Sequence, residues 1–253
     1  MNNTVKAINE GYPSSPLTGN EPLFIVTNNA SGNHDAKETR ETIERRLSEA
    51  GRQHTLMTVD DGAQLKVTAE QALAQARAQG GIVVAVGGDV TLSAVSEVVL
   101  GSGIPMGILP QGTFNYFGRT AGISQKTESA IDALKDAVVL PVDVGLLNDR
   151  VFLVNASLRL YPQLLEDRET YKQRYGRSRL IALRSAIVTL AHAHRSLRVQ
   201  IDLEGEPRRH MKTPTIVVGN NSLQLEQLGI NRVDEIKRHY IVAMASCTRA
   251  ASR

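Results

Sequence analysis

Apolar positions in the first half of the chain form short runs, separated by longer stretches of helical spacing. The runs are rich in β-branched residues, which is typical of buried strands. They lie at 23–28, 54–59, 82–86 and 105–110. Helical spacing predicts helices over 35–50, 65–79, 92–100, 116–121 and 126–137. This alternation of strand and helix predicts a mainly parallel sheet with helices on both of its faces.

The pattern changes near Val138. Beyond it, apolar positions favour antiparallel strands, most clearly where they alternate with period two from Leu197 to Leu203. The predicted strands lie at 138–147, 151–156, 197–203, 215–220 and 239–245, with a helix over 176–194. We therefore predict the fold class α/β, in which an N-terminal domain with a mainly parallel sheet precedes a mostly antiparallel β-sandwich domain. The predicted boundaries are a flexible tail at 1–20, the α/β domain at 21–138 and an incomplete β-rich domain at 139–253.

The run at 82–86 leads into a glycine-rich turn and then a helix. Gly87, Gly88 and Asp89 end the strand, and Thr91 is predicted to cap the helix. Such a turn leaves backbone N–H groups at the helix N-terminus able to hold an anion. Asp89 would lie at the carboxyl edge of the sheet, where open α/β sheets bind ligands. We expect a phosphate with a cation beside it, although a Gly-Gly pair after a strand is as often a simple tight turn.

Composition limits the classes of function. Hydrophobic residues make up 42% and charged residues 22% of the 253 positions, which is ordinary for a globular protein. The net charge of +3 and pI near 9.1 suit an anionic ligand or membrane surface. The chain has no Trp and only 4% aromatic residues, which argues against base stacking and a nucleic-acid partner. Cys247 is the single cysteine, so no disulfide can form within the chain, and a reducing cytoplasm fits.

A second glycine-rich turn follows the run at 105–110, and the two turns together resemble a known family. GGDVT at 87–91 and PQGTFNYFGR at 110–119 resemble the GGDGT and PxGTxNxFA motifs of the diacylglycerol kinase catalytic family, which includes sphingosine kinases and bacterial lipid kinases. The segment at 28–32 resembles its N-P-x-S-G turn, and Asp143 to Asn155 resembles its D-x-G…F-x-N crossover. The four motifs occur in family order.

This resemblance implies an ATP-dependent lipid kinase that transfers the γ-phosphoryl group to a hydroxyl of diacylglycerol or a related lipid, with ATP and Mg²⁺ as cofactors. It implies that Asp89 is catalytic, near Mg²⁺ and the transferred phosphoryl group. The implied nucleotide-binding residues are Gly87, Gly88, Asp89, Thr91, Gly112, Thr113, Asn115 and Asn28. Asp234 falls where the family has an acidic metal-binding turn, and it is the candidate metal ligand. For Asp89 and Asn115, hydrogen bonds within a local turn are the structural alternative.

Departures from the family pattern support other interpretations. Val90 stands where the family usually has Gly, and a β-branched residue fits poorly if the turn requires positive φ. Tyr116 occupies a position where many members have Asp or His. The late Asp-Gly-Glu motif that supplies the family's proposed general base does not occur after Gly229, so the chain resembles a C-terminally truncated member. The alternative is a catalytically degenerate relative that binds nucleotide or lipid, and a kinase of the NAD kinase type is a further candidate.

The expected partner is a lipid substrate, reached by peripheral association with a membrane surface from the cytoplasm. Basic residues between Arg168 and Arg184 could meet anionic headgroups, although a solvated helix face is the commoner explanation. The first 20 residues lack the apolar core of a signal peptide, and no apolar run has the length of about 20 residues that a spanning helix needs. An incomplete sandwich would expose a strand edge, which makes a homodimer a further possibility.

Overall fold

The computed structural model describes residues 17–29, 36–148, 150–158, 197–202, 205, 207–213, 215–227, 229 and 241–245. The chain divides into two compact units. The first comprises Met1–Val154 with Asn220–His239, and the second comprises Asn155–Gly219 with Tyr240–Arg253. The first unit therefore includes a segment from late in the sequence.

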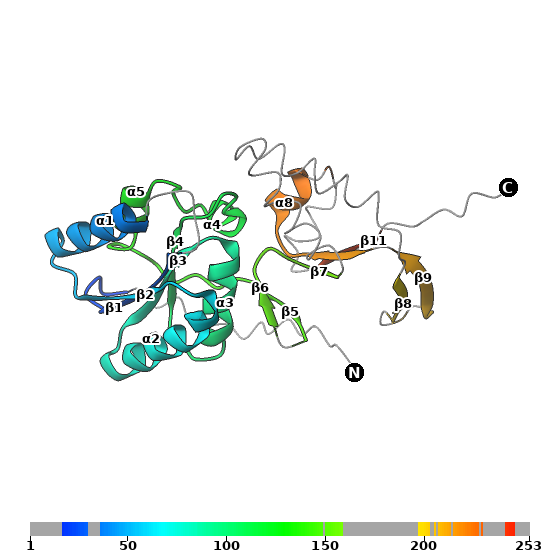
Figure 1. Cartoon of the computed structure of the whole chain (residues 1–253), viewed down its shortest axis with the longest axis horizontal. Helices are drawn as coiled ribbons and strands as arrows, with labels where there is room; N and C mark the ends of the chain where they lie inside the picture. Colours follow the sequence, from blue (N-terminus) through cyan, green and yellow to red (C-terminus); the bar gives the residue numbers. More distant parts are fainter. Residues whose placement is uncertain are drawn as a thin grey trace. The chain divides into compact units, whose positions relative to one another are not determined.

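A parallel sheet of four strands, in the order β2-β1-β3-β4, forms the centre of the first unit (Figure 1). Its strands are β1 (Leu23–Asn28), β2 (His54–Val59), β3 (Ile82–Gly87) and β4 (Met106–Pro110). Every neighbouring pair is parallel, with Leu23 level with both His54 and Ile82. All four strands therefore end at the same edge of the sheet, as the sequence predicts.

Helices cover both faces of this sheet, and Figure 1 shows α1 and α5 on one side with α2 and α3 on the other. The helices are α1 (Ala36–Glu49), α2 (Leu65–Gln79, preceded by the 3₁₀ turn η1, Gly62–Gln64), α3 (Asp89–Val99), α4 (Tyr116–Thr120) and α5 (Thr127–Ala133). Leu23 and Ile25 belong to the core under α1 and α5, whereas Phe24 and Val26 belong to the core under α2 and α3. β3 is buried along its whole length because it lies inside the sheet with both faces covered.

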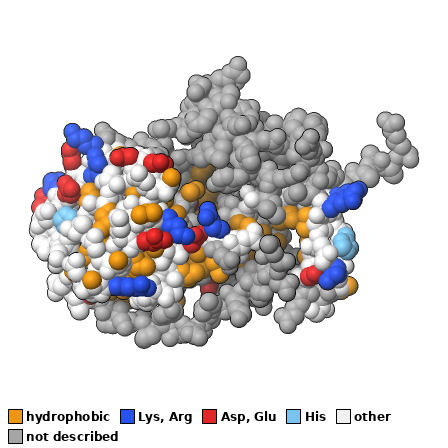
Figure 2. All heavy atoms as spheres, turned by 60° about the horizontal axis from the view of Figure 1, so that its bottom comes forward, with side chains coloured by type: hydrophobic (Ala, Val, Ile, Leu, Met, Phe, Trp, Pro, Cys, Tyr) orange, Lys and Arg blue, Asp and Glu red, His pale blue; other side chains and the backbone are white. Residues whose placement is uncertain are grey.

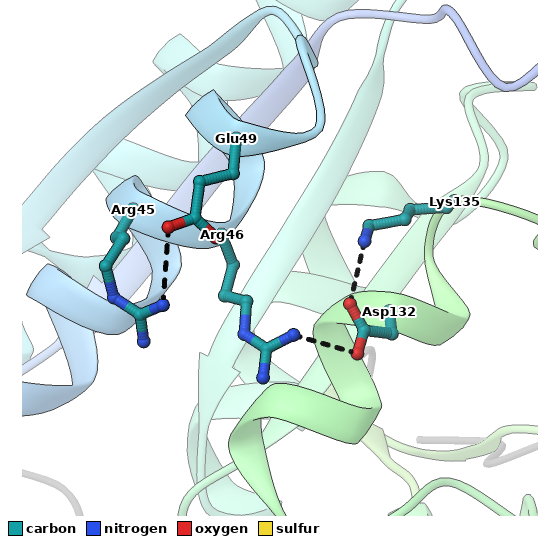
Figure 3. A network of polar contacts seen from close by, with 5 residues as sticks. All are labelled: Arg45, Arg46, Glu49, Asp132 and Lys135. Atoms are coloured by element: carbon teal, nitrogen blue, oxygen red, sulfur yellow. Dashed lines mark hydrogen bonds and ion pairs between the residues drawn. The ribbon is translucent and has the colours of Figure 1, made fainter.

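Polar contacts join α1 to α5 at the surface (Figure 3). Arg46 reaches Asp132 of α5 at 3.2 Å, and Lys135 binds the same carboxylate at 2.8 Å. The hydrogen bond from Lys135 is the main cause that lowers the pKa of Asp132. Arg45 pairs with Glu49 within α1 at 3.6 Å. Such exposed pairs contribute little to stability, so the apolar core beneath them holds these helices in place.

The chain next forms a short antiparallel hairpin of β5 (Gly145–Leu147) and β6 (Arg150–Phe152). Side chains of α3 hold this segment by its backbone. Glu97 Oε2 accepts a hydrogen bond from the Val151 N–H at 3.3 Å, and Ser93 Oγ accepts one from the Leu153 N–H at 3.3 Å. The helix that begins at the glycine-rich turn therefore also fixes the segment that leaves the first unit.

Described strands of the second unit are all antiparallel. One sheet has the order β11-β10-β7 and the other is the hairpin β8-β9. Their bounds are β7 (Asn155–Leu158), β8 (Leu197–Ile201), β9 (Arg209–Thr213), β10 (Ile216–Gly219) and β11 (Val242–Ala245). These strands confirm the predicted fold class, a parallel α/β sheet followed by antiparallel sheets. The helix predicted over 176–194 lies outside the described residues.

The helix α8 (Ser222–Gln227) was not predicted from the sequence. It follows β10 directly along the chain, yet it belongs to the first unit. Among the helices in the described ranges, none has the length and apolar character needed to cross a membrane.

Candidate active site

Two glycine-rich turns meet where β3 and β4 end, because these strands are parallel neighbours with Gly87 level with Pro110. A Cβ atom on Gly112 would lie 2.6 Å from the Cα atom of Gly88, and one on Gly88 would lie 3.2 Å from the Cα atom of Gly112. The backbone at Gly88 is extended, with φ −83° and ψ 176°. Close approach of the two turns, rather than an unusual dihedral angle, therefore explains the glycine at this position.

The carboxylate of Asp89 joins the first turn to the helix after the second. Its Oδ2 accepts a hydrogen bond from the Tyr116 N–H at 3.1 Å, and its Oδ1 accepts one from the Phe117 N–H at 3.0 Å. These donors are the first two backbone N–H groups of α4, which have no partner within the helix. Burial raises the pKa of Asp89, and the two N–H contacts and the charge of Arg119 offset this only in part. Asp89 is therefore a half-buried acid that aligns both turns.

Asn115 shapes the second turn from within. It adopts a left-handed conformation, with φ 48°, that Asn tolerates better than most residues. Its Oδ1 accepts a hydrogen bond from the Gly112 N–H at 2.7 Å, and its Nδ2 donates to Gln125 Oε1 at 2.8 Å. The bond to Gly112 matches the local-turn alternative for Asn115, whereas the bond to Gln125 reaches a residue beyond α4.

Thr91 is 2% exposed, and its side chain packs on Gly87, where an added Cβ would lie 2.6 Å from the Thr91 Cβ. Asn28 Nδ2, at the end of β1, donates to Thr91 Oγ1 at 3.3 Å. The predicted capping role of Thr91 is wrong, because α3 begins earlier, with Gly88 as its N-cap. Thr91 and Asn28 therefore connect the ends of β1 and β3 to the first turn of α3.

The condition for strain at Val90, a positive φ, is not met. Val90 lies in the first turn of α3, and among the described residues only Asn115 and Asn148 combine a side chain with positive φ. Its side chain is 70% exposed, so it meets no steric obstacle. The helix begins one residue before Val90, and the backbone there needs no glycine.

Backbone donors for an anion differ between the two turns. The Gly112 N–H and the first two N–H groups of α4 already have partners inside the protein. In α3 the first helical hydrogen bond runs from Leu92 to Gly88 at 3.0 Å, so the N–H groups of Asp89, Val90 and Thr91 precede the helical ladder. Thr113 is half-buried between Gly112 and α4. The geometry therefore offers an anion the N-terminus of α3, with Gly112 packed against it.

Hydrogen bonds also join α8 to α4, the helix that follows the second turn, and no sequence motif indicated this contact. Asn221, which is 2% exposed, donates from Nδ2 to the Tyr116 carbonyl at 3.3 Å and to Thr120 Oγ1 at 3.0 Å. Its Oδ1 accepts from the Gln224 N–H at 3.0 Å, which caps α8. The Tyr116 hydroxyl donates to Gln227 Oε1 at 2.9 Å, and its ring stacks on Phe114 with centroids 5.4 Å apart. Tyr116 therefore belongs to a contact between α4 and α8.

Asp234, the predicted metal ligand, lies outside the described residues. Across the described ranges, no three His, Cys, Asp or Glu side chains come together in a way that could hold a metal ion. Asp89 is the acidic residue at the turns, and both of its oxygen atoms accept backbone hydrogen bonds.

Comparison with known proteins connects this geometry to a family. Residues 22–147 match the model of the diacylglycerol kinase catalytic domain. A diacylglycerol kinase from Staphylococcus haemolyticus is 31% identical over 134 residues, which is 51% of this chain and 39% of that protein. A Pseudomonas aeruginosa protein described as a probable lipid kinase, YegS-like, is 37% identical over 138 residues, which is 53% of this chain and 43% of that protein. The matched segments thus span less than half the length of these curated relatives.

A crystal structure of a diacylglycerol kinase from Bacillus anthracis shares the fold. It superposes with a TM-score of 0.60 over 80% of this chain and 65% of that chain, at 19% sequence identity.

Proposed function

Because residues 22–147 belong to the diacylglycerol kinase catalytic domain family, we propose that this protein is a lipid kinase that transfers the γ-phosphoryl group of ATP to a hydroxyl of diacylglycerol or a related lipid. The observation that carries the proposal is the pair of glycine-rich turns at the ends of β3 and β4, held together by Asp89. Phosphoryl transfer depends mainly on positioning and on stabilisation of charge, and packed turns beside a helix N-terminus supply both.

Residues of the two turns have distinct roles in this proposal. The N–H groups at the start of α3 bind phosphate oxygen atoms. Gly88 and Gly112 allow the two turns to pack against each other, because a side chain at either position would push the turns apart. Asp89 keeps α4 aligned with α3, and Asn28 with Thr91 fixes the end of β1 against the same helix. Asn115 sets the shape of the second turn.

Among the described residues, the protein ligands available to Mg²⁺ are few, because no acidic cluster lies at the turns. Mg²⁺ is usually bound by one or two carboxylates together with substrate phosphates and water. The one carboxylate at the turns already accepts two backbone hydrogen bonds, and the described ranges hold no acidic cluster. Asp234 remains the proposed ligand from elsewhere in the chain.

The test is phosphate transfer from γ-labelled ATP to diacylglycerol in mixed micelles, with sphingosine and NAD as competing acceptors. We expect labelled lipid and no labelled NAD. Asp89→Asn should lower kcat by about 100-fold, since misplacing a binding group by an ångström costs about that much. The matched control is Gly62→Ala, because no atom lies within 4 Å of the added Cβ.

Other outcomes would contradict the proposal in different ways. Labelled NAD with no labelled lipid would assign the protein to the NAD kinase type. ATP binding without transfer to any lipid would favour the degenerate nucleotide-binding relative, an alternative supported by the lack of an acidic cluster among the described residues.

A further inference from the structure

One face of the β8–β9 hairpin carries two exposed cations on opposite strands. In its antiparallel register Arg198 lies opposite Lys212, and Gln200 lies opposite His210. Directly opposite residues point to the same face of an antiparallel pair, and diagonal neighbours are about 7–8 Å apart. All four of these side chains are exposed, whereas Val199 on the other face is half-buried. Figure 2 shows blue and pale-blue side chains gathered at its right, where Figure 1 places this hairpin.

Within the described residues of the hairpin, no acidic side chain pairs with Arg198 or Lys212. Asp202 is already engaged by Arg208 at 2.8 Å and by Gln200 Nε2 at 3.1 Å, and the hydrogen bond from Arg208 is the main cause that lowers its pKa. In the described part of the chain, no acidic side chain forms an ion pair with Arg198 or Lys212. Like charges directly opposite each other destabilise a strand pair, so this arrangement lowers the stability of the isolated hairpin.

We propose that the Arg198–Lys212 face of this hairpin docks the protein on an anionic membrane surface by binding lipid phosphate groups. The face presents its cations side by side on a pleated surface, which suits an array of headgroups rather than a single enclosed ligand. Residues 197–213 contain no Phe, Tyr or Trp on which nucleic-acid bases could stack. The proposed function supplies the reason for docking, because a lipid kinase must reach an acceptor in a bilayer. The binding to the membrane can be measured without any phosphate transfer.

The experiment measures sedimentation of the purified chain with vesicles, without ATP. We expect binding to phosphatidylcholine vesicles that contain phosphatidylserine, little binding to phosphatidylcholine alone, and loss of binding at high salt. The double variant Arg198→Gln/Lys212→Gln should bind about 25-fold more weakly, at roughly fivefold per cation. It should unfold at the same temperature as the unmodified protein or a higher one, since the opposed charges are removed.

The matched control is Lys37→Gln/Arg45→Gln, which removes the same net charge from exposed positions on α1. Equal losses in the two double variants, or no loss in the hairpin variant, would overturn the proposal. Binding to DNA or RNA without binding to vesicles would overturn the choice of a membrane. A protein that binds vesicles but transfers no phosphate would refute only the proposed function. Transfer to a soluble short-chain diacylglycerol without vesicle binding would refute only the docking surface.

Discussion

Opposing effects set the proton affinity of Asp89. Burial favours the neutral carboxyl, whereas the N–H groups of Tyr116 and Phe117 and the charge of Arg119 favour the carboxylate, and burial is the larger effect. The same contacts align the two glycine-rich turns. Ionisation of Asp89 therefore costs more free energy in the folded protein than in the unfolded chain, so the contribution of this residue to stability depends on pH.

The sign of this dependence is fixed by the raised pKa. An acid whose folded-state pKa is raised binds its proton more tightly in the folded protein, so its stabilising contribution is complete below the unfolded pKa of about 3.9 and is lost as pH rises through the folded value. We expect the free energy of unfolding of the unmodified protein, relative to Asp89→Asn, to decrease from about pH 4 upward and then level off. Urea denaturation of both proteins at several pH values measures this difference, and a difference that increases with pH would contradict it.

Gly112 shows how tightly the turns are packed. In Gly112→Ala the added Cβ would lie 2.6 Å from the Cα of Gly88 and 2.7 Å from Asn115 Oδ1, so the turns must separate. Overpacking of this kind costs about 1–3 kcal/mol, and we expect a loss of that size in the free energy of unfolding. We also expect weaker ATP binding in calorimetry. Gly62→Ala is the control, and equal ATP affinity in all three proteins would argue against a phosphate site at the N-terminus of α3 beside Gly112.

At the scale of elements, the sequence predicted most where local periodicity decides the structure. The limits of β1, β2 and α2 agree with the predicted ranges, because buried strands and amphipathic helices leave a direct hydrophobic pattern. β9 and α8 were missed, since β9 is mostly exposed and carries few apolar residues and α8 has only six residues. The start of α3 was misplaced because Thr91 is a good N-cap residue by type, but its side chain packs on Gly87 instead.

The contact between α8 and α4 gives a prediction at this scale. Asn221→Asp keeps the oxygen that caps α8 but replaces the donor to the Tyr116 carbonyl and Thr120 with a buried acceptor. We expect the free energy of unfolding to fall by about 1–3 kcal/mol, the usual cost of a buried polar group left without its partner. Hydrogen exchange at the Tyr116 and Phe117 amides should accelerate, because α4 loses one of its supports.

Tyr116→Phe is the matched comparison, because it keeps the ring and removes the hydroxyl that donates to Gln227, an exposed side chain. Its cost should stay within about 1 kcal/mol. If Asn221→Asp left exchange at both amides unchanged, α8 would have no part in holding the second turn.

At the scale of the whole molecule, the order of a parallel and an antiparallel region was predictable, but the interleaving of the units was not. Asn220–His239 returns to the first unit after the strands of the second. Hydrophobic periodicity reports which face of an element is buried, and it carries no information on which distant segment covers that face. Contacts such as Asn221 to Tyr116, 105 positions apart, therefore required the structure.

Division into two units predicts a localised response to nucleotide. A ligand that binds only the folded state stabilises it by about 2.7 kcal/mol at a concentration of 100 times its Kd. If ATP binds at the turns, hydrogen-exchange protection should increase at the end of β3, the start of α3 and α4. Amides of β8 and β9 lie in the other unit and should keep their exchange rates. Exchange with and without ATP, compared with the Gly112→Ala variant, tests this. An equal rise of protection in the hairpin and at the turns would place the nucleotide elsewhere or show that the two units unfold together. Protection confined to the hairpin would refute the site at the turns.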